Sequence, residues 1–181
     1  MMSGGFNRGF APFAAALGIV TLFSAGCVYP DLKNFSREER TLYLYNFANS
    51  TFDADAQTEL NETLREEIHS KEDFLLVPEP EEARLGLYGE VTLYRKEGRL
   101  YDNLRNPTRY ELIIGVRIRL REKPSGRVLL STEESATVHY SPREGFPESE
   151  VQARHRLLRE LARNIHRSMV GAYRGTYGQV E

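Results

Sequence analysis

The chain has 181 residues, with 24 Lys and Arg against 26 Asp and Glu and a formal net charge of -2. This balance argues against a general affinity for nucleic acid. The single cysteine excludes an intramolecular disulfide, so the stability of the protein must come from its hydrophobic core.

The first 26 residues are typical of a secretory signal peptide. Residues 10–23 are almost wholly apolar and follow Arg8, but these 14 residues fall short of the ~20 needed to span a bilayer. Three small residues, 24–26, then lead directly into Cys27. We therefore expect residues 1–26 to be a signal peptide and Cys27 to be the site of lipid attachment. The alternative is an ordinary cleaved signal peptide with an accidental cysteine nearby.

The segment Ser24-Ala25-Gly26-Cys27 resembles the lipobox of bacterial lipoproteins. That resemblance implies a diacylglycerol thioether on Cys27 and an acylated amino terminus. Several acyl chains together hold a protein on a membrane essentially permanently, because each buried methylene contributes about 0.8 kcal/mol. Residues 27–39 contain proline and charge without any apolar period, so we expect them to form a lipidated N-terminal tether.

The domain, residues 40–172, is expected to begin with a strand over Arg40–Phe47, which is rich in leucine and aromatic residues. A helix should follow from Asp53, because apolar residues then recur every four positions. The members of that apolar stripe are Ala56, Leu60, Leu64 and Ile68. Phe74–Val77 suits either a brief strand or the exit of the helix.

Three longer strands are predicted from an apolar alternation of period two. They cover Leu85–Arg95, Glu111–Arg121 and Arg127–Tyr140, with Lys96–Thr108 as a loop between the first two. The alternation in the first strand puts Tyr88 and Tyr94 on one face. A turn at residues 123–126 suggests that the last two strands form a hairpin.

A second helix is expected from about Glu148, because Val151, Leu158 and Ile165 lie at helical spacing. Glycines at positions 171, 175 and 178 are expected to end regular structure, leaving residues 173–181 as a flexible tail. The order of elements predicts an α+β fold, with two helices packed on one face of a four-stranded mixed, largely antiparallel sheet.

No catalytic motif is legible in the sequence, which lacks G-x-S-x-G, G-x-x-x-x-G-K-[ST] and H-E-x-x-H. The four histidines are not spaced for a metal site, and no cofactor is expected. The chain is predicted not to be an enzyme, although a hydrolase without a readable motif stays an alternative.

Two groups of side chains are candidates for binding. Arg117, Arg119 and Arg121 project from one side of a strand, with Arg95 on the neighbouring strand, and together they could bind phosphate groups. Tyr88 and Tyr94 are candidate contacts to a protein partner, because tyrosine is enriched at interfaces. The alternative is that these arginines simply face water.

The order of these signals resembles the LptE family of outer-membrane lipoproteins over nearly the whole mature length. The resemblance is carried by 25-AGCVYP-30, 42-LYLYNFANST-51, 60-LNETLREE-67, 83-ARLGLYGEV-91, the strand 110–121 and 125-SGRVL-129. It implies two helices on a four-stranded sheet, tethered to the periplasmic face of the outer membrane. It also implies a non-enzymatic protein that plugs and helps assemble an LptD-like β-barrel, which translocates lipopolysaccharide. Such a protein presents lipopolysaccharide to that barrel, and the phosphates of lipopolysaccharide are then the expected ligand of Arg95, Arg117, Arg119 and Arg121.

A second hypothesis is a stand-alone periplasmic lipoprotein that binds a lipid or a glycan by itself. A closed apolar cavity of several hundred cubic ångströms between sheet and helices would favour it.

Overall fold

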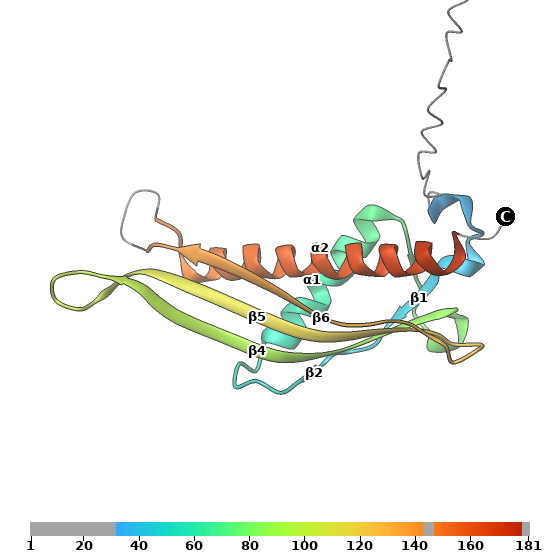
Figure 1. Cartoon of the computed structure of the whole chain (residues 1–181), viewed down its shortest axis with the longest axis horizontal. Helices are drawn as coiled ribbons and strands as arrows, with labels where there is room; N and C mark the ends of the chain where they lie inside the picture. The colour runs from blue at the N-terminus through green and yellow to red at the C-terminus, as the bar shows by residue number, and fades with distance from the viewer. Residues whose placement is uncertain (1–31, 143–146, 179–181) are drawn as a thin grey trace, which may run out of the picture.

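The computed structural model describes residues 32–142 and 147–178, so the expected signal peptide and Cys27 lie outside the described residues. Its long elements are three strands and two helices (Figure 1). The strands are β4 (Leu85–Tyr101), β5 (Pro107–Glu122) and β6 (Val128–Tyr140), and the helices are α1 (Ala56–Lys71) and α2 (Glu150–Tyr177). The predicted α+β class is confirmed.

Three very short strands complete one six-stranded sheet: β1 (Thr41–Leu44), β2 (Ala48–Asn49) and β3 (Leu75–Leu76). The order is β3-β1-β4-β5-β6, with β2 also paired to β4. The pairs that involve β1, β2 and β3 are parallel, and β4, β5 and β6 are antiparallel. The sheet is therefore mixed as expected, but the expectation of four strands is wrong. Two-residue strands are too short to show a period of two.

The predicted first strand, Arg40–Phe47, is divided in the structure. The chain leaves β1 after Leu44 and returns to β4 at β2, and between them the Phe47 ring is buried at 2% exposure. A Cβ atom added to Gly89 of β4 would lie 2.5 Å from that ring. Glycine at position 89 therefore makes room for Phe47 in the core.

The expectation of a loop over Lys96–Thr108 is also wrong. Both strands of the β4–β5 hairpin continue well beyond the predicted ends and leave only residues 102–106 as a turn, in which the Asp102 N–H donates to the Asn106 carbonyl at 2.9 Å. Register shifts in β4 between Val91 and Leu93 and between Gly98 and Leu100 break the alternation. Such bulges hide the continuation of a strand from a test of period two.

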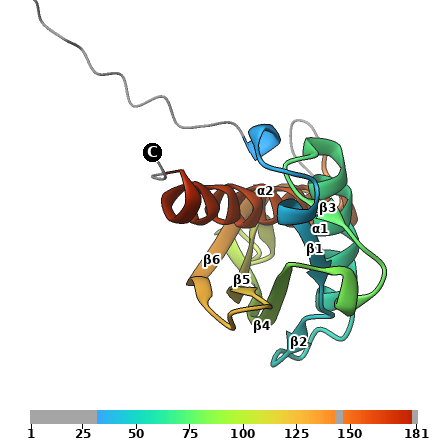
Figure 2. The ribbon, with the colours of Figure 1, turned by 90° about the vertical axis from the view of Figure 1, so that its right-hand side faces the viewer.

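Both helices lie on the same side of the sheet (Figures 1 and 2). The helix predicted from Asp53 begins at Ala56, and α2 begins with a capping box between Ser149 and Gln152. α2 does not end near Gly171 as expected but runs to Tyr177. Its last turns are held by the core, since Met169 and Tyr173 are 0% and 2% exposed.

Among the described residues, three 3-10 helices lie at one end of the sheet: η1 (Leu32–Asn34), η2 (Glu38–Arg40) and η3 (Pro80–Glu82). The Leu32 side chain is fully buried and belongs to the main hydrophobic core. Part of the segment that was expected to be a tether is therefore packed against the domain.

The layer between sheet and helices is tightly filled. Leucines and isoleucines from both sides, among them Leu64, Ile114 and Leu158, have no surface accessible to water. A cavity of several hundred cubic ångströms would leave such residues accessible, so this packing does not favour the stand-alone lipid binder. Among the described residues, no helix is long and apolar enough to cross a membrane.

Side chains of α2 also reach the outer edge of β6. Arg156 donates from Nη2 to the carbonyl of His139 at 2.9 Å, and Asn164 donates from Nδ2 to the carbonyl of Ser135 at 3.2 Å. The helix thus occupies hydrogen-bonding groups of the edge strand as well as covering the core.

Candidate functional site

The side of the sheet opposite α1 and α2 is the candidate site. No helix covers it (Figure 2), and the strand pairing places aromatic and basic side chains there. The strand pairing sets their positions: Arg117, Arg119 and Arg121 of β5 lie opposite Glu90, Tyr88 and Gly86 of β4. We call this side the uncovered face.

A stack of three tyrosines occupies the β1 end of the uncovered face. The Tyr45 ring stacks on Tyr88 with centroids 4.1 Å apart, and Tyr43 meets Tyr45 edge-on at 4.7 Å. A Cβ atom on Gly86 would lie 3.1 Å from the Tyr45 ring and 3.2 Å from the Tyr88 ring. Burial raises the pKa of the Tyr88 hydroxyl, and so does its hydrogen bond with Tyr45, while Arg121 and Lys123 oppose that rise. The stack therefore forms an aromatic surface that also carries polar hydroxyl groups.

The arginines beside the stack differ in how far their charge is neutralised. Arg117 lies between two carboxylates, with Nη1 at 3.2 Å from Glu90 and Nη2 at 2.9 Å from Glu133. The Arg121 side chain donates only to the carbonyl of Gly126 at 3.4 Å, and the Arg119 side chain has no hydrogen bond or ion pair with any described residue. Arg119 and Arg121 are therefore the guanidinium groups ready to receive an anion.

Arg95 lies apart from this group. Arg95 lies opposite Ile113 of β5. Ile113 precedes Arg117 by four residues, which corresponds to about 13 Å along the strand. Its guanidinium pairs with Glu97 at 2.9 Å. The structure thus brings together three of the four candidate arginines and leaves Arg95 outside.

The expectation that Tyr94 shares a face with Tyr88 is wrong. The bulge between Val91 and Leu93 reverses the alternation, so Leu93 becomes 38% exposed and Tyr94 points to the helix side. There the Tyr94 hydroxyl accepts a hydrogen bond from Arg154 of α2 at 3.2 Å, and the guanidinium lies 4.8 Å from the ring centroid. Tyr94 is a packing residue of the helix layer in this structure.

Arg154 is itself held by two carboxylates. Its nitrogens lie 2.7 Å from Asp53 and 2.6 Å from Glu59. The hydrogen bond from Arg154 lowers the pKa of Asp53, and burial partly opposes that effect. The cluster ties the start of α2 to α1 and to β4, and so belongs to the fold rather than to the uncovered face.

Sequence reasoning did not assign Tyr43 and Tyr45 to the site. Their signal was present in 42-LYLY-45, where leucine and tyrosine alternate with a period of two. The leucines of that run are buried and the tyrosines face outward. Alternation alone could therefore have placed both tyrosines opposite the core.

A shallow hollow of about 260 Å³ joins the tyrosines to the arginines and is lined by Tyr88, Glu90, Arg117 and Arg119, among others. Its chemistry suits recognition of an anion beside an aromatic surface. Across residues 32–142 and 147–178, no three His, Cys, Asp or Glu side chains are arranged to hold a metal ion.

Most of the chain matches the model of a known protein family. The family model LptE, described as lipopolysaccharide assembly, matches residues 39–169. The chain belongs to the LptE family. Membership confirms the resemblance seen in the sequence and gives this LptE-family protein a general role in lipopolysaccharide assembly, within a non-catalytic lipoprotein family of the bacterial outer membrane. No curated protein matches the chain in sequence.

Solved structures support the fold of this LptE-family protein. Rare lipoprotein B from Shewanella oneidensis is similar with a TM-score of 0.51 and 16% identity, over 74% of this chain and 96% of that one. A hypothetical protein from Chlamydia trachomatis gives a TM-score of 0.56 at 13% identity, over 74% and 97%. At these identities the likeness extends to the fold alone.

Proposed function

We propose that this LptE-family protein is anchored by acylated Cys27 to the periplasmic face of the outer membrane and plugs an LptD-like β-barrel through its uncovered face. The observation that carries the proposal is the family match over residues 39–169 together with a sheet face that no helix covers. A plug must complement the inner wall of a barrel, and tyrosine supplies large contact area with a polar end. The stack of Tyr43, Tyr45 and Tyr88 is the part of the face that fits this role.

We infer further that the same face presents lipopolysaccharide to the barrel through its phosphate groups. Arg119 and Arg121 are the candidates, since a guanidinium binds phosphate through two parallel hydrogen bonds. Arg117 and Arg95 are already paired with carboxylates, and a phosphate would have to displace those partners. The four predicted arginines therefore do not contribute equally.

A photo-crosslinking amino acid at Tyr45 tests the contact with the barrel. The matched control places it at Arg163, which is exposed on α2, remote from the uncovered face. We expect position 45 to crosslink to an outer-membrane barrel in cells and position 163 to crosslink far less. Crosslinks from position 163 alone would show that the wrong face has been assigned.

The double variant Arg119→Glu and Arg121→Glu tests the contact with lipopolysaccharide. We expect affinity at low salt to fall by about tenfold or more, since two charge-assisted contacts become repulsive. Arg95→Glu with Arg163→Glu makes the same change in net charge and should cost much less. Unchanged affinity in the first variant would remove lipopolysaccharide binding from this face.

A further inference from the structure

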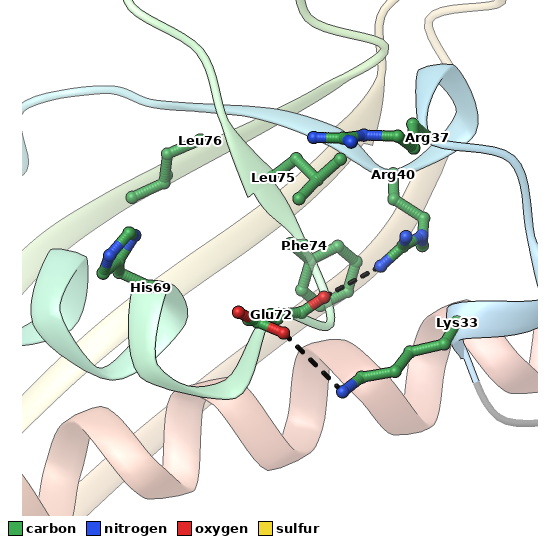
Figure 3. Close-up of a pocket in the computed structure, with 8 residues that line it drawn as sticks. All are labelled: Lys33, Arg37, Arg40, His69, Glu72, Phe74, Leu75 and Leu76. Atoms are coloured by element: carbon green, nitrogen blue, oxygen red, sulfur yellow. Dashed lines mark hydrogen bonds and ion pairs between the residues drawn. The ribbon is translucent and has the colours of Figure 1, made fainter.

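A second basic site lies at the other end of the molecule, where the described chain begins. It is a cavity of about 550 Å³ between η1, η2, the end of α1 and β3 (Figure 3). Figure 3 shows Lys33, Arg37 and Arg40 on one side of the cavity and His69 on the other. Its apolar lining comes from Phe74, Leu75 and Leu76.

Arg40 gives this cavity a buried positive charge. The residue is only 8% exposed, and its Nη1 donates to the carbonyls of Glu72 and Asp73 at 2.8 and 3.1 Å. Its Nε atom is buried without a hydrogen-bond partner, and the guanidinium forms no salt bridge with a described carboxylate. A buried charge of this kind is costly unless an anion lies nearby.

The two cations at the rim are able to receive that anion. Arg37 is exposed and its side chain has no hydrogen bond or ion pair with the described residues. Lys33 pairs with Glu72 at 3.8 Å, with the two side chains 55% and 73% exposed. So exposed a pair contributes at most about 1 kcal/mol, so the ion pair with Glu72 does little to hold Lys33 away from an anion in the cavity.

Among the described residues that line the cavity, three cations oppose the single carboxylate of Glu72, and His69 adds a ring whose nitrogens can donate or accept. Phe74 is 1% exposed and closes the floor, while Leu75 and Leu76 are half-buried on the edge strand. A basic rim above an apolar wall suits an amphiphile with a phosphate head and a hydrocarbon stem.

The position of the cavity along the chain agrees with that ligand. Leu32 is anchored in the core and precedes Lys33, and Leu32 comes only five positions after Cys27 in the sequence. A stretch of five residues spans at most about 18 Å. If Cys27 is acylated, the cavity is held within reach of the lipid headgroups, where basic residues favour anionic lipid.

We propose that this cavity binds the phosphate group of an anionic membrane phospholipid, and so sets the orientation of the domain on the leaflet to which Cys27 anchors it. The inference rests on the proposed function for the anchoring of Cys27. Arg37 and Lys33 contact the phosphate oxygens, Arg40 supplies charge from the wall, and the leucines of β3 contact the glycerol and the first methylenes.

The test uses the chain from residue 27 with Cys27→Ala, which contains all of the described residues and removes the anchor. Dihexanoyl phosphatidylglycerol, dihexanoyl phosphatidylcholine and inorganic phosphate are titrated below the micelle concentration and followed by NMR. We expect saturable shifts at His69, Leu75 and Leu76 with phosphatidylglycerol, and binding about fivefold weaker or more with phosphatidylcholine.

Arg37→Glu should weaken phosphatidylglycerol binding by about fivefold or more, while Arg163→Glu, an equal charge change on α2, should alter it by less than about twofold. Equal losses in both variants, shifts away from the cavity, or binding of inorganic phosphate without the lipid would each overturn the proposal. None of these measurements involves a barrel, so their failure leaves the crosslinking test of the proposed function intact.

Discussion

The two sides of the sheet are built from the same strands but are specified by different interactions. On the helix side of β5, Leu112, Ile114 and Val116 are buried at 0 to 1% exposure, and their contribution depends on packing. On the uncovered face, Arg117 and Arg119 alternate with them and are exposed. The helix side should therefore determine stability, whereas the uncovered face should determine what the protein binds.

Two adjacent isoleucines of β5 test whether the two sides of the sheet contribute differently to stability. Ile114 has no accessible surface and Ile113 is half-buried on the uncovered face. Ile114→Ala should lower the free energy of unfolding by about 2–5 kcal/mol, because it leaves a cavity, and Ile113→Ala by about 1 kcal/mol. Urea unfolding measures both. Equal losses would mean that the two sides are not energetically distinct.

Two glycines test the same difference between the two sides, with smaller expected losses of stability. A Cβ atom at Gly89 would meet the buried Phe47 ring at 2.5 Å, whereas one at Gly115 meets Leu93 on the uncovered face at 3.3 Å. We expect Gly89→Ala to cost about 1–3 kcal/mol through overpacking and Gly115→Ala to cost less than about 1 kcal/mol. Thermal unfolding of the two variants distinguishes them. A larger loss at Gly115 would contradict this ranking.

Arg154 tests the polar part of the helix side. Arg154→Ala should cost about 1–3 kcal/mol at neutral pH, since it leaves Asp53 and Glu59 without their shared partner. The pKa of Asp53 is lowered below 3.8 in the folded protein, so the stabilisation is complete above that pH and is lost as the pH falls through the folded value.

The difference in stability between wild type and Arg154→Ala should therefore shrink below about pH 3.8. Denaturation at pH 7 and at pH 3 measures this change. The double arginine variant of the uncovered face serves as the control, since Arg119 and Arg121 make few contacts and their replacement should change stability by no more than about 0.5 kcal/mol. A constant difference across this pH range would exclude Asp53 as the origin of the effect.

Sequence reasoning identified the long elements because their patterns extend over many residues. The apolar stripe of α1 and the alternation of β5 were read correctly, and both follow from burial on one side. Of the two alternatives for Phe74–Val77, the brief strand is confirmed by β3, whereas β2 was not predicted because two residues cannot establish a period. The length of α2 was underestimated because Gly171 and Gly175 look like helix ends, while the tertiary packing of Tyr173 keeps the helix intact.

The candidate site was predicted less well, for a reason that lies in the register. Leu93 continues the apolar alternation of β4, so the bulge that moves Tyr94 to the helix side leaves no trace in the pattern. Likewise, the pairing of Arg117 with Glu90 and Glu133 depends on which residues lie opposite one another in neighbouring strands. Alternation in a single sequence indicates which side of a regular strand a residue occupies, but it reveals neither a bulge nor the neighbours of that residue across the sheet.

The contacts of Arg156 and Asn164 with the outer edge of β6 have a consequence for pairing with other chains. An edge strand whose carbonyl and amide groups are free can pair with a strand of another protein or of a second copy of this chain. Two carbonyls of β6 are already engaged by α2. These engaged carbonyls leave fewer groups on the edge of β6 with which a foreign strand could pair, which should lower the tendency of the domain to aggregate.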